Sequence, residues 1–362
     1  MEELKLKYLK GFLTRTHLCV VDFVLKLQEW ESRIRGCYAG LDSFNNNDFL
    51  KIIIIDACFI IELFLRCYFR NAYCLKNDPI LSKPWLLDDI IRDLVLLENQ
   101  LPYFVLEDIY KLAGLNPEFP SFTTITIHYF QHFNVQNINS ERAQCPKHFT
   151  DLLRTFLLPL SFDFVQEVGN AIEHVYSVSQ LSEAGLVFQV SESKCLLDLE
   201  FDKGVLKMPC FHVYDSTEMY MRNILAFEEC NYSGQNYITQ YLIMLDFLIN
   251  SEKDVSILVE KGIIVNWMGD ANALDTMINN LCKNISMYRF NSKYRSLCKG
   301  LNGFYENPRN KYKAIFVHEY FNTPWKIAST ITAVLLLLFT FIQAKDQQKL
   351  KIALEVSKDM FL

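Results

Sequence analysis

Apolar residues recur with the three- and four-residue spacing of helices through most of this chain, and short polar clusters separate the apolar segments. Two of the predicted helices flank a break at Pro102. The other helical segments are expected at about 2–34, 51–70, 121–133, 148–158, 215–230, 237–250, 254–262, 270–282 and 285–320.

The helical spacing is lost over residues 185–213. Residues 185–190 alternate, and residues 196–213 are typical of two strands joined by Asp202-Lys203-Gly204, a sequence that hairpin turns favour. We therefore predict a mainly α protein with a small antiparallel β-hairpin sheet, an α+β fold.

A polar corner interrupts the apolar sequence at residues 94–110, LVLLENQLPYFVLEDIY. Glu98, Asn99 and Gln100 form the corner, and Pro102 breaks the helix and suits the first turn of the next one. If the preceding helix continues to Glu98, its carboxylate falls at the end of an apolar stripe. We expect two core helices to meet here.

Asp56 and Glu98 are the best candidate functional residues because both are ionisable groups on apolar helix faces. We expect both carboxylates to be largely buried, and therefore either neutral or paired. The proposed cationic partners are Arg35 and Arg222. Buried structural ion pairing and an acid/base role both fit this pattern.

A charge-free run near the carboxy terminus, residues 327–344, is about 27 Å long as a helix and matches a bilayer core. Lys326 and Lys345 bracket it, and Trp325 lies at the expected interface depth. The alternative is a buried core helix. We predict a soluble body over 1–322, a membrane span over 323–344 and a polar tail over 345–362.

The orientation of the span is expected to leave the body in the cytosol. Basic residues on the two sides balance, and the charged start, MEELKLKYLKGFL, has no signal-peptide core. The 11 cysteines without a CxxC pair are typical of reduced thiols. The sequons at Asn231 and Asn284 should therefore remain unmodified.

Composition and motifs exclude several function classes. The net charge of -6 provides no electrostatic footprint for nucleic acid. GxSxG, GxxxxGK[ST] and GxGxxG motifs are absent from the sequence. His128 and His132 are spaced like metal ligands but have no third ligand nearby, and the acidic helix face at 88–93 is typical of solvated surface. We assign no catalytic, cofactor-binding or metal residue and infer no small-molecule ligand.

A series of ordered motifs resembles the plant family known as domain of unknown function 247. The motifs are RGCY, IIIIDACFIIELFLR, NDPILSKPW, DLVLLENQLPYFVLEDIYKL, SEAGLVFQ, LEFDKGVLKMP, STEMYMRNILAFEEC, DVSILVEKGIIVNWMG and EYFNTPWKIAS.

The resemblance implies a mostly helical plant protein with one membrane span near the carboxy terminus and no firmly assigned activity. It also implies unknown protein partners, with roles in reproduction such as pollen-side self-incompatibility or suppression of female organs. Relatives carry a further segment with a Gly-Pro-Tyr-His motif before the helix that starts here at Glu2. The first hypothesis is therefore a membrane-anchored recognition or signalling protein. The alternative is an enzyme of unrecognised class that uses Asp56 or Glu98.

Overall fold

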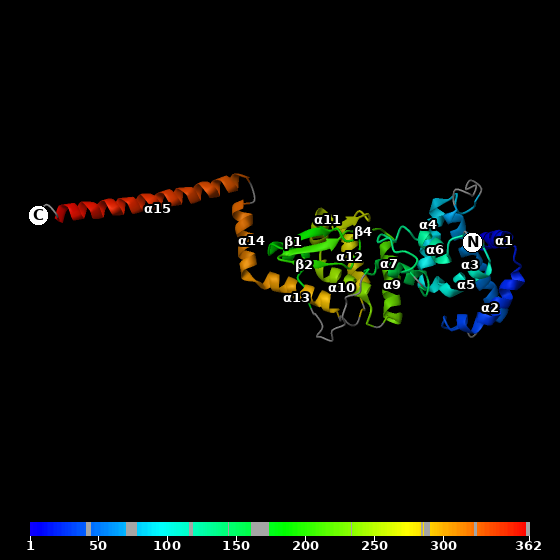
Figure 1. Ribbon diagram of the computed structural model, residues 1–362. Helices are drawn as coiled ribbons and strands as arrows, with labels where there is room; N and C mark the ends of the chain where they lie inside the picture. Colours follow the sequence, from blue (N-terminus) through cyan, green and yellow to red (C-terminus); the bar gives the residue numbers. More distant parts are fainter. Residues whose placement is uncertain are drawn as a thin grey trace.

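The apolar run after Asn45 forms the central helix of the amino-terminal half, α3 (Asn46–Tyr68), in the computed structural model (Figure 1). The structure describes residues 1–40, 45–69, 78–115, 119–143, 145, 146–160, 174–232, 234–283, 285, 290–321 and 324–359. Around α3 lie α1 (Glu2–Thr16), α2 (Val20–Arg35), α5 (Tyr103–Leu112) and α6 (Phe122–Tyr129), with α4 (Pro84–Val95) beside them.

Almost every residue of α3 from 53 to 65 is buried, because this stretch is apolar on all sides and is covered by neighbouring helices. The ring of Phe64 on α3 contacts the rings of Phe122, Tyr129, Phe130 and Phe149 at centroid distances of 4.1 to 6.2 Å. Aromatic pairs at such distances add packing energy beyond their buried area. The core of this half therefore centres on Phe64.

The helical segment expected over 2–34 is interrupted. The helix α1 ends at Thr16 and is followed by His17, which has a left-handed φ of 56°. The helix α2 starts after Cys19, whose N–H donates to the Asp22 carboxylate at 2.9 Å. This break reverses the chain, so that α1 and α2 pack on α3 as separate helices.

The carboxy-terminal half surrounds α10 (Tyr237–Leu248), in which nearly all residues are buried. Five short strands lie in this half: β1 (Val187–Ser191), β2 (Glu200–Asp202), β3 (Val205–Pro209), β4 (Phe211–Val213) and β5 (Ile264–Asn266). The other helices are α7 (Phe149–Leu157), α8 (Val178–Glu183), α9 (Thr217–Asn231), α11 (Glu252–Glu260), α12 (Ala271–Cys282), α13 (Ser292–Glu306), α14 (Pro308–Phe321) and α15 (Pro324–Asp359).

The predicted hairpin is confirmed: β2 and β3 are antiparallel and Asp202 pairs with Val205. Lys203 and Gly204 have φ values of 46° and 85°, the left-handed pair that a two-residue hairpin turn requires. The sheet is larger than expected, because β1 pairs in parallel with β3 and sets the buried Phe188 beside the buried Leu206. A second sheet joins β4 and β5 in parallel. The fold is thus mainly helical with small sheets.

One helix, α15, is long and apolar enough over Pro324–Lys349 to cross a membrane. None of its apolar window is buried, and the helix projects away from the body (Figure 1). It is therefore not a buried core helix. Its helical backbone continues past the expected boundary at 344 to Asp359.

The polar corner is built around Gln100, which is buried. Its Nε2 donates to the carbonyl oxygens of Leu94 and Leu96, both at 2.7 Å, and its Oε1 accepts from the Phe149 N–H at 3.0 Å. The Gln100 carbonyl accepts from the Tyr38 hydroxyl at 3.0 Å. One side chain thus forms hydrogen bonds with backbone groups at the end of α4 and at the start of α7.

The prediction that Glu98 is buried is wrong. The helix α4 ends at Val95 and the backbone at Leu96 is extended, so the next residues leave the line of the apolar stripe. Glu98 and Asn99 lie exposed on a short 3₁₀ turn. Pro102 stands at the N-cap of α5, which confirms the break.

We expect Gln100→Ala to lower the free energy of unfolding by roughly 3 kcal/mol, because it leaves buried backbone groups unsatisfied. Glu98→Ala, at an exposed position two residues away, should change it by less than about 0.5 kcal/mol. Denaturant unfolding of the full chain in detergent measures both values. Equal stability of the two variants would contradict the role assigned to Gln100.

Candidate functional site

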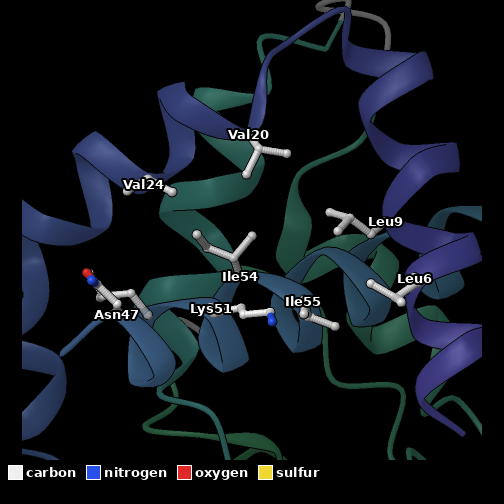
Figure 2. A pocket seen from close by; sticks show the side chains of 9 residues that line it. Leu6, Leu9, Val20, Val24, Asn47, Lys51, Ile54 and Ile55 are labelled. Atoms are coloured by element: carbon white, nitrogen blue, oxygen red, sulfur yellow. The ribbon is translucent and has the colours of Figure 1, made fainter. Parts of the chain in front are cut away.

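An apolar groove of about 360 Å³ lies between α1, α2 and α3 (Figure 2). Leucines of α1 and valines of α2 approach it from opposite sides above Ile54 of α3. The lining residues are Leu6, Leu9, Val20, Val24, Asn47, Leu50, Lys51, Ile54 and Ile55. The groove is thus a product of the chain reversal between α1 and α2.

The floor and the walls of the groove differ in exposure. Leu50 and Ile54 on the floor are buried, whereas Leu6 and Val20 on the walls are 44% and 38% exposed. Apolar surface of this kind loses about 25 cal/mol of stabilisation for each Å² left in water. Contiguous exposed apolar surface is typical of interaction sites.

Lys51 supplies the cation at the groove. Its side chain is exposed, and in the described part of the chain no carboxylate lies within ion-pair distance of it. None of the lining residues that the structure describes is acidic. The groove therefore offers apolar contacts and one positive charge.

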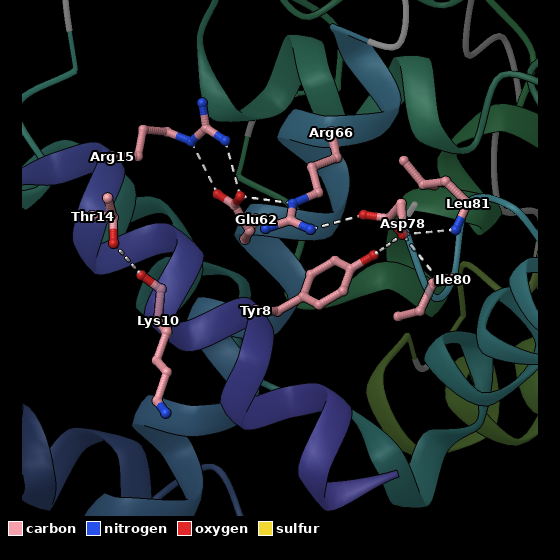
Figure 3. A network of polar contacts seen from close by, with 9 residues as sticks. All are labelled: Tyr8, Lys10, Thr14, Arg15, Glu62, Arg66, Asp78, Ile80 and Leu81. Carbon is pink, nitrogen blue, oxygen red and sulfur yellow. Dashed lines mark hydrogen bonds and ion pairs between the residues drawn. The ribbon is translucent and has the colours of Figure 1, made fainter. Parts of the chain in front are cut away.

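A buried network of charges holds α1 against α3 (Figure 3). Arg15 Nε and Nη2 donate to the Glu62 carboxylate at 3.0 and 2.9 Å, and Arg66 Nε donates to it at 2.8 Å. Arg66 Nη1 then donates to Asp78 at 2.8 Å, and Asp78 also accepts from the Tyr8 hydroxyl at 2.7 Å. Glu62 is completely buried, so its charge depends on these partners.

Asp78 closes the network electrostatically. Burial raises the pKa of its carboxyl, but the N–H of Leu81, the Tyr8 hydroxyl and the Arg66 guanidinium outweigh burial and lower this pKa below its usual value. Because the folded pKa is lowered, the stabilisation from Asp78 is present above the usual aspartate pKa and is lost as pH falls through the folded value.

The network sets the position of one groove wall. Tyr8 and Arg15 lie on the face of α1 toward α3, while Leu6 and Leu9 line the groove. A Cβ at Gly11 would overlap the Arg66 guanidinium, so a larger residue there would force the Arg66 side chain to shift within the network. Breaking the network should therefore disturb the groove.

Asp56 lies beside the groove but not in the predicted arrangement. Its carboxylate is 28% exposed and pairs with Lys5 Nζ at 2.7 Å, so it ties α1 to α3 at the outer end. The Asp56 side chain is partly buried and ion-paired, but the prediction that its partner is Arg35 or Arg222 is wrong. Lys5 comes from α1, which crosses this part of α3.

The two predicted arginine partners make local ion pairs. Arg35 pairs with Glu31 one turn earlier in α2 at 2.8 Å, and its guanidinium lies over the Phe49 ring at 4.4 Å. Arg222 pairs with Glu218 in α9 at 2.5 Å, and its side chain is 53% exposed. Both helices supply the carboxylate four residues away, so neither arginine needs a distant partner.

The sequence prediction missed several buried carboxylates, among them Glu62 and Glu228. Arg154 of α7 donates to Glu228 of α9 at 2.8 Å, and the Thr239 N–H and hydroxyl of α10 donate at 2.9 and 2.8 Å. Burial raises the pKa of Glu228, against the lowering effect of Arg154. The sequence did hold a signal for Glu62, which is a charged residue inside the apolar run 52–65 and lies four residues before Arg66.

The remaining titratable candidates do not assemble a reaction centre. His128 packs edge-on against Tyr68 with ring centroids 4.9 Å apart, and His132 is exposed. Among the described residues no three His, Cys, Asp or Glu side chains are grouped to hold a metal ion. The face at 88–93 is solvated as predicted, with Arg92 paired to Asp89 at 2.9 Å.

Asp246 on α10 is the described carboxyl with the clearest upward shift. Burial, followed by the charge of Asp275, raises the pKa of Asp246 to about 6. Its Oδ1 has no hydrogen-bond partner in the described part of the chain. A perturbed carboxyl of this kind occurs at functional sites and in structural clusters, but Asp246 does not line the groove.

We expect Glu62→Ala to lower the free energy of unfolding by roughly 3 to 5 kcal/mol, because it leaves two arginines partly buried without their shared carboxylate. Glu62→Gln should cost less, since it keeps the shape. As a control, Glu29→Ala removes the exposed pair with Lys26 on α2 and should cost less than about 1 kcal/mol. The measurement is denaturant unfolding of the full chain. Similar losses of unfolding free energy for Glu62→Ala and Glu29→Ala would contradict the role assigned to the Glu62 network.

Comparisons with known proteins identify the family of this chain. The sequence profile of the plant family DUF247, described as a plant protein of unknown function, matches residues 1–339. UPF0481 protein At3g47200 of Arabidopsis thaliana is 28% identical over 344 residues, which cover 87% of this chain and 71% of that protein. A second UPF0481 protein of that plant, At3g02645, is 22% identical over 425 residues, covering 89% of this chain and 78% of its own length. No solved structure is significantly similar. Because the family match spans nearly the whole sequence, this chain belongs to the plant DUF247 family.

Proposed function

We propose that this protein is a membrane-anchored recognition protein that binds a protein partner through the groove between α1, α2 and α3. The observation that carries the proposal is the lining of the groove: in the described part of the chain it is apolar except for Asn47 and Lys51 and includes no acidic side chain. Such a lining favours binding over chemistry, since an enzyme site gathers reactive groups in a concave pocket.

The partner element that fits best is an amphipathic helix. Helices dock into apolar grooves between other helices through side chains spaced three and four residues apart. Leucines from α1 and valines from α2 form two walls that such a stripe would enter, and a carboxylate on the partner would meet Lys51. A charge pair of this kind contributes specificity.

The alternative, an enzyme that uses Asp56 or Glu98, has weaker support. The Asp56 carboxylate is engaged by Lys5 at 2.7 Å, and Glu98 is exposed on its 3₁₀ turn. Neither residue lines the groove. The positions of the two candidates thus favour structural and surface roles.

The anchor in this proposal is α15. Its apolar surface is unburied, and Trp325 at its start is 85% exposed, which suits the membrane interface. We place the body in the cytosol. Under this placement both sequons stay unmodified, although the Asn231 side chain is exposed; Asn284 lies outside the described residues.

The reproductive setting is a further part of the proposal and comes from the family resemblance alone. Capture of partners from floral and from vegetative membranes tests it. A partner found equally in both tissues would contradict a dedicated reproductive role.

We expect Leu6→Glu and Lys51→Glu each to reduce partner capture by the full chain at least about tenfold, because they place charge in an apolar contact or reverse the positive charge that Lys51 contributes to the groove. Leu25→Glu is the matched control: Leu25 is 56% exposed on α2 and does not line the groove. Quantitative pull-down from plant membranes, with unfolding temperatures measured in parallel, reports both effects. Equal loss of capture in Leu25→Glu would exclude the groove as the binding surface.

Full-length protein should remain with membranes through an alkaline carbonate wash, whereas a form ending at Thr323 should become soluble. Fractionation and immunoblotting measure this. In the same samples, glycosidase treatment should not change the electrophoretic mobility of the protein. Loss of the full-length protein in the wash rules out the anchor, and a shift abolished by Asn231→Gln with Asn284→Gln reverses the orientation.

A further inference from the structure

The helix α14 joins the body to α15 and runs across the direction of α15 (Figure 1). One face of α14 is fixed to the body. The Asn310 side-chain amide donates to the Phe304 carbonyl at 2.8 Å, and Ala314 packs on Gly185 so closely that a Cβ there would lie 3.1 Å from it. The helix is therefore a fixed part of the surface and not a loose connection.

The outward face of α14 carries large apolar and aromatic side chains. Tyr312, Ile315, Phe316 and Tyr320 are 50% to 72% exposed. Positions 312, 316 and 320 follow one another at four-residue intervals, and the rings of Phe316 and Tyr320 lie 5.1 Å apart. A stripe of this kind is costly in water and implies a covering surface.

Cations flank this stripe. At 100° per residue, Lys311 and Lys313 fall on opposite sides of Tyr312, and both are exposed. Arg309 is also exposed at the start of the helix. The acidic residue on this face, Glu319, lies 4.0 Å from Lys326. The outward face thus combines apolar side chains and Glu319 with basic residues along its margins.

We propose that α14 lies in the headgroup layer of an anionic membrane, with Tyr312, Ile315, Phe316 and Tyr320 in the upper acyl region and the flanking cations on lipid phosphates. Amphipathic helices with basic margins bind membrane surfaces in this way. The proposal rests on the anchoring by α15 proposed above.

Continuity with α15 identifies the membrane, rather than a protein, as the surface that covers this face. Two residues separate the end of α14 at Phe321 from the start of α15 at Pro324, so the chain between them spans roughly 10 Å at most. When α15 crosses the bilayer, the carboxy-terminal end of α14 is held at the headgroups. Because α14 runs across the direction of α15, it then lies parallel to the membrane surface (Figure 1).

This arrangement orients the whole body. Since α14 is fixed to the body, its contact with lipid fixes the orientation of the body relative to the membrane. The helices α1 and α2 lie at the end of the molecule away from α15 (Figure 1). The groove would then face away from the membrane, where a partner can reach it.

The test places the photo-crosslinker p-benzoylphenylalanine in the full chain, reconstituted in vesicles of phosphatidylcholine and phosphatidylserine. Phe316→p-benzoylphenylalanine should give lipid adducts by mass spectrometry. Tyr214→p-benzoylphenylalanine, on an exposed body position, is the negative control, and Leu337→p-benzoylphenylalanine, 71% exposed on α15, reports the anchor itself. Charge reversal by Lys311→Glu with Lys313→Glu should lower the adducts at position 316 roughly fivefold in these vesicles.

The outcomes separate the two proposals. Lipid adducts at 337 but not at 316 overturn the interfacial helix and leave the anchor standing. A protein dimer crosslinked through 316, in place of lipid adducts, also overturns it and assigns the face to a second copy of the chain. Absence of lipid adducts at both positions overturns the anchor and the interfacial helix together. Adducts at 316 that do not change on charge reversal overturn the role of anionic lipid.

Discussion

The structure depends first on satisfying the backbone hydrogen bonds that are freed where the chain turns between α4 and α5. Buried amide and carbonyl groups without partners each cost about 1 to 3 kcal/mol. The Gln100 side chain supplies these hydrogen bonds to a carbonyl at the end of α4 and to an N–H at the start of α7. Nearby, the Thr150 hydroxyl donates to the Val95 carbonyl at 2.8 Å, and the Leu97 N–H donates to the Asn223 side chain at 2.9 Å. The corner thereby joins the amino-terminal helices to α7 and α9, and the relative placement of the two halves follows from it.

Buried charges fix the two halves in a similar way. Glu62 holds α1 against α3 through Arg15 and Arg66, and Glu228 holds α9 against α7 through Arg154. Pairs of this kind contribute little net stability relative to apolar packing, but losing one partner is costly. Their effect is to permit one arrangement of helices and to penalise others. In the amino-terminal half, the permitted arrangement is the one that leaves the groove open between α1 and α2.

The groove lies at the opposite end of the molecule from α14 and α15 (Figure 1). The groove gathers apolar side chains around Lys51, whereas α14 sets aromatic side chains between Lys311 and Lys313. Both surfaces leave apolar area in water in the isolated chain, and each is matched in chemistry to a different occupant. The function proposed above assigns a protein partner to the groove and a lipid surface to α14, with the body of the protein between them.

The sequence by itself determined the helical fold, the hairpin turn at Lys203-Gly204, the long apolar helix at the carboxy terminus and the family, because these depend on local periodicity, turn geometry and ordered motifs. It did not determine which polar residues are buried. Glu98 and Gln100 are two residues apart in one corner, and only the extended backbone at Leu96 decides that the glutamine enters the core. The groove likewise has no sequence signature, since its walls come from α1 and α2 and its floor from α3. Burial and ion pairing are properties of neighbouring elements, and these neighbours are chosen only when the whole chain packs.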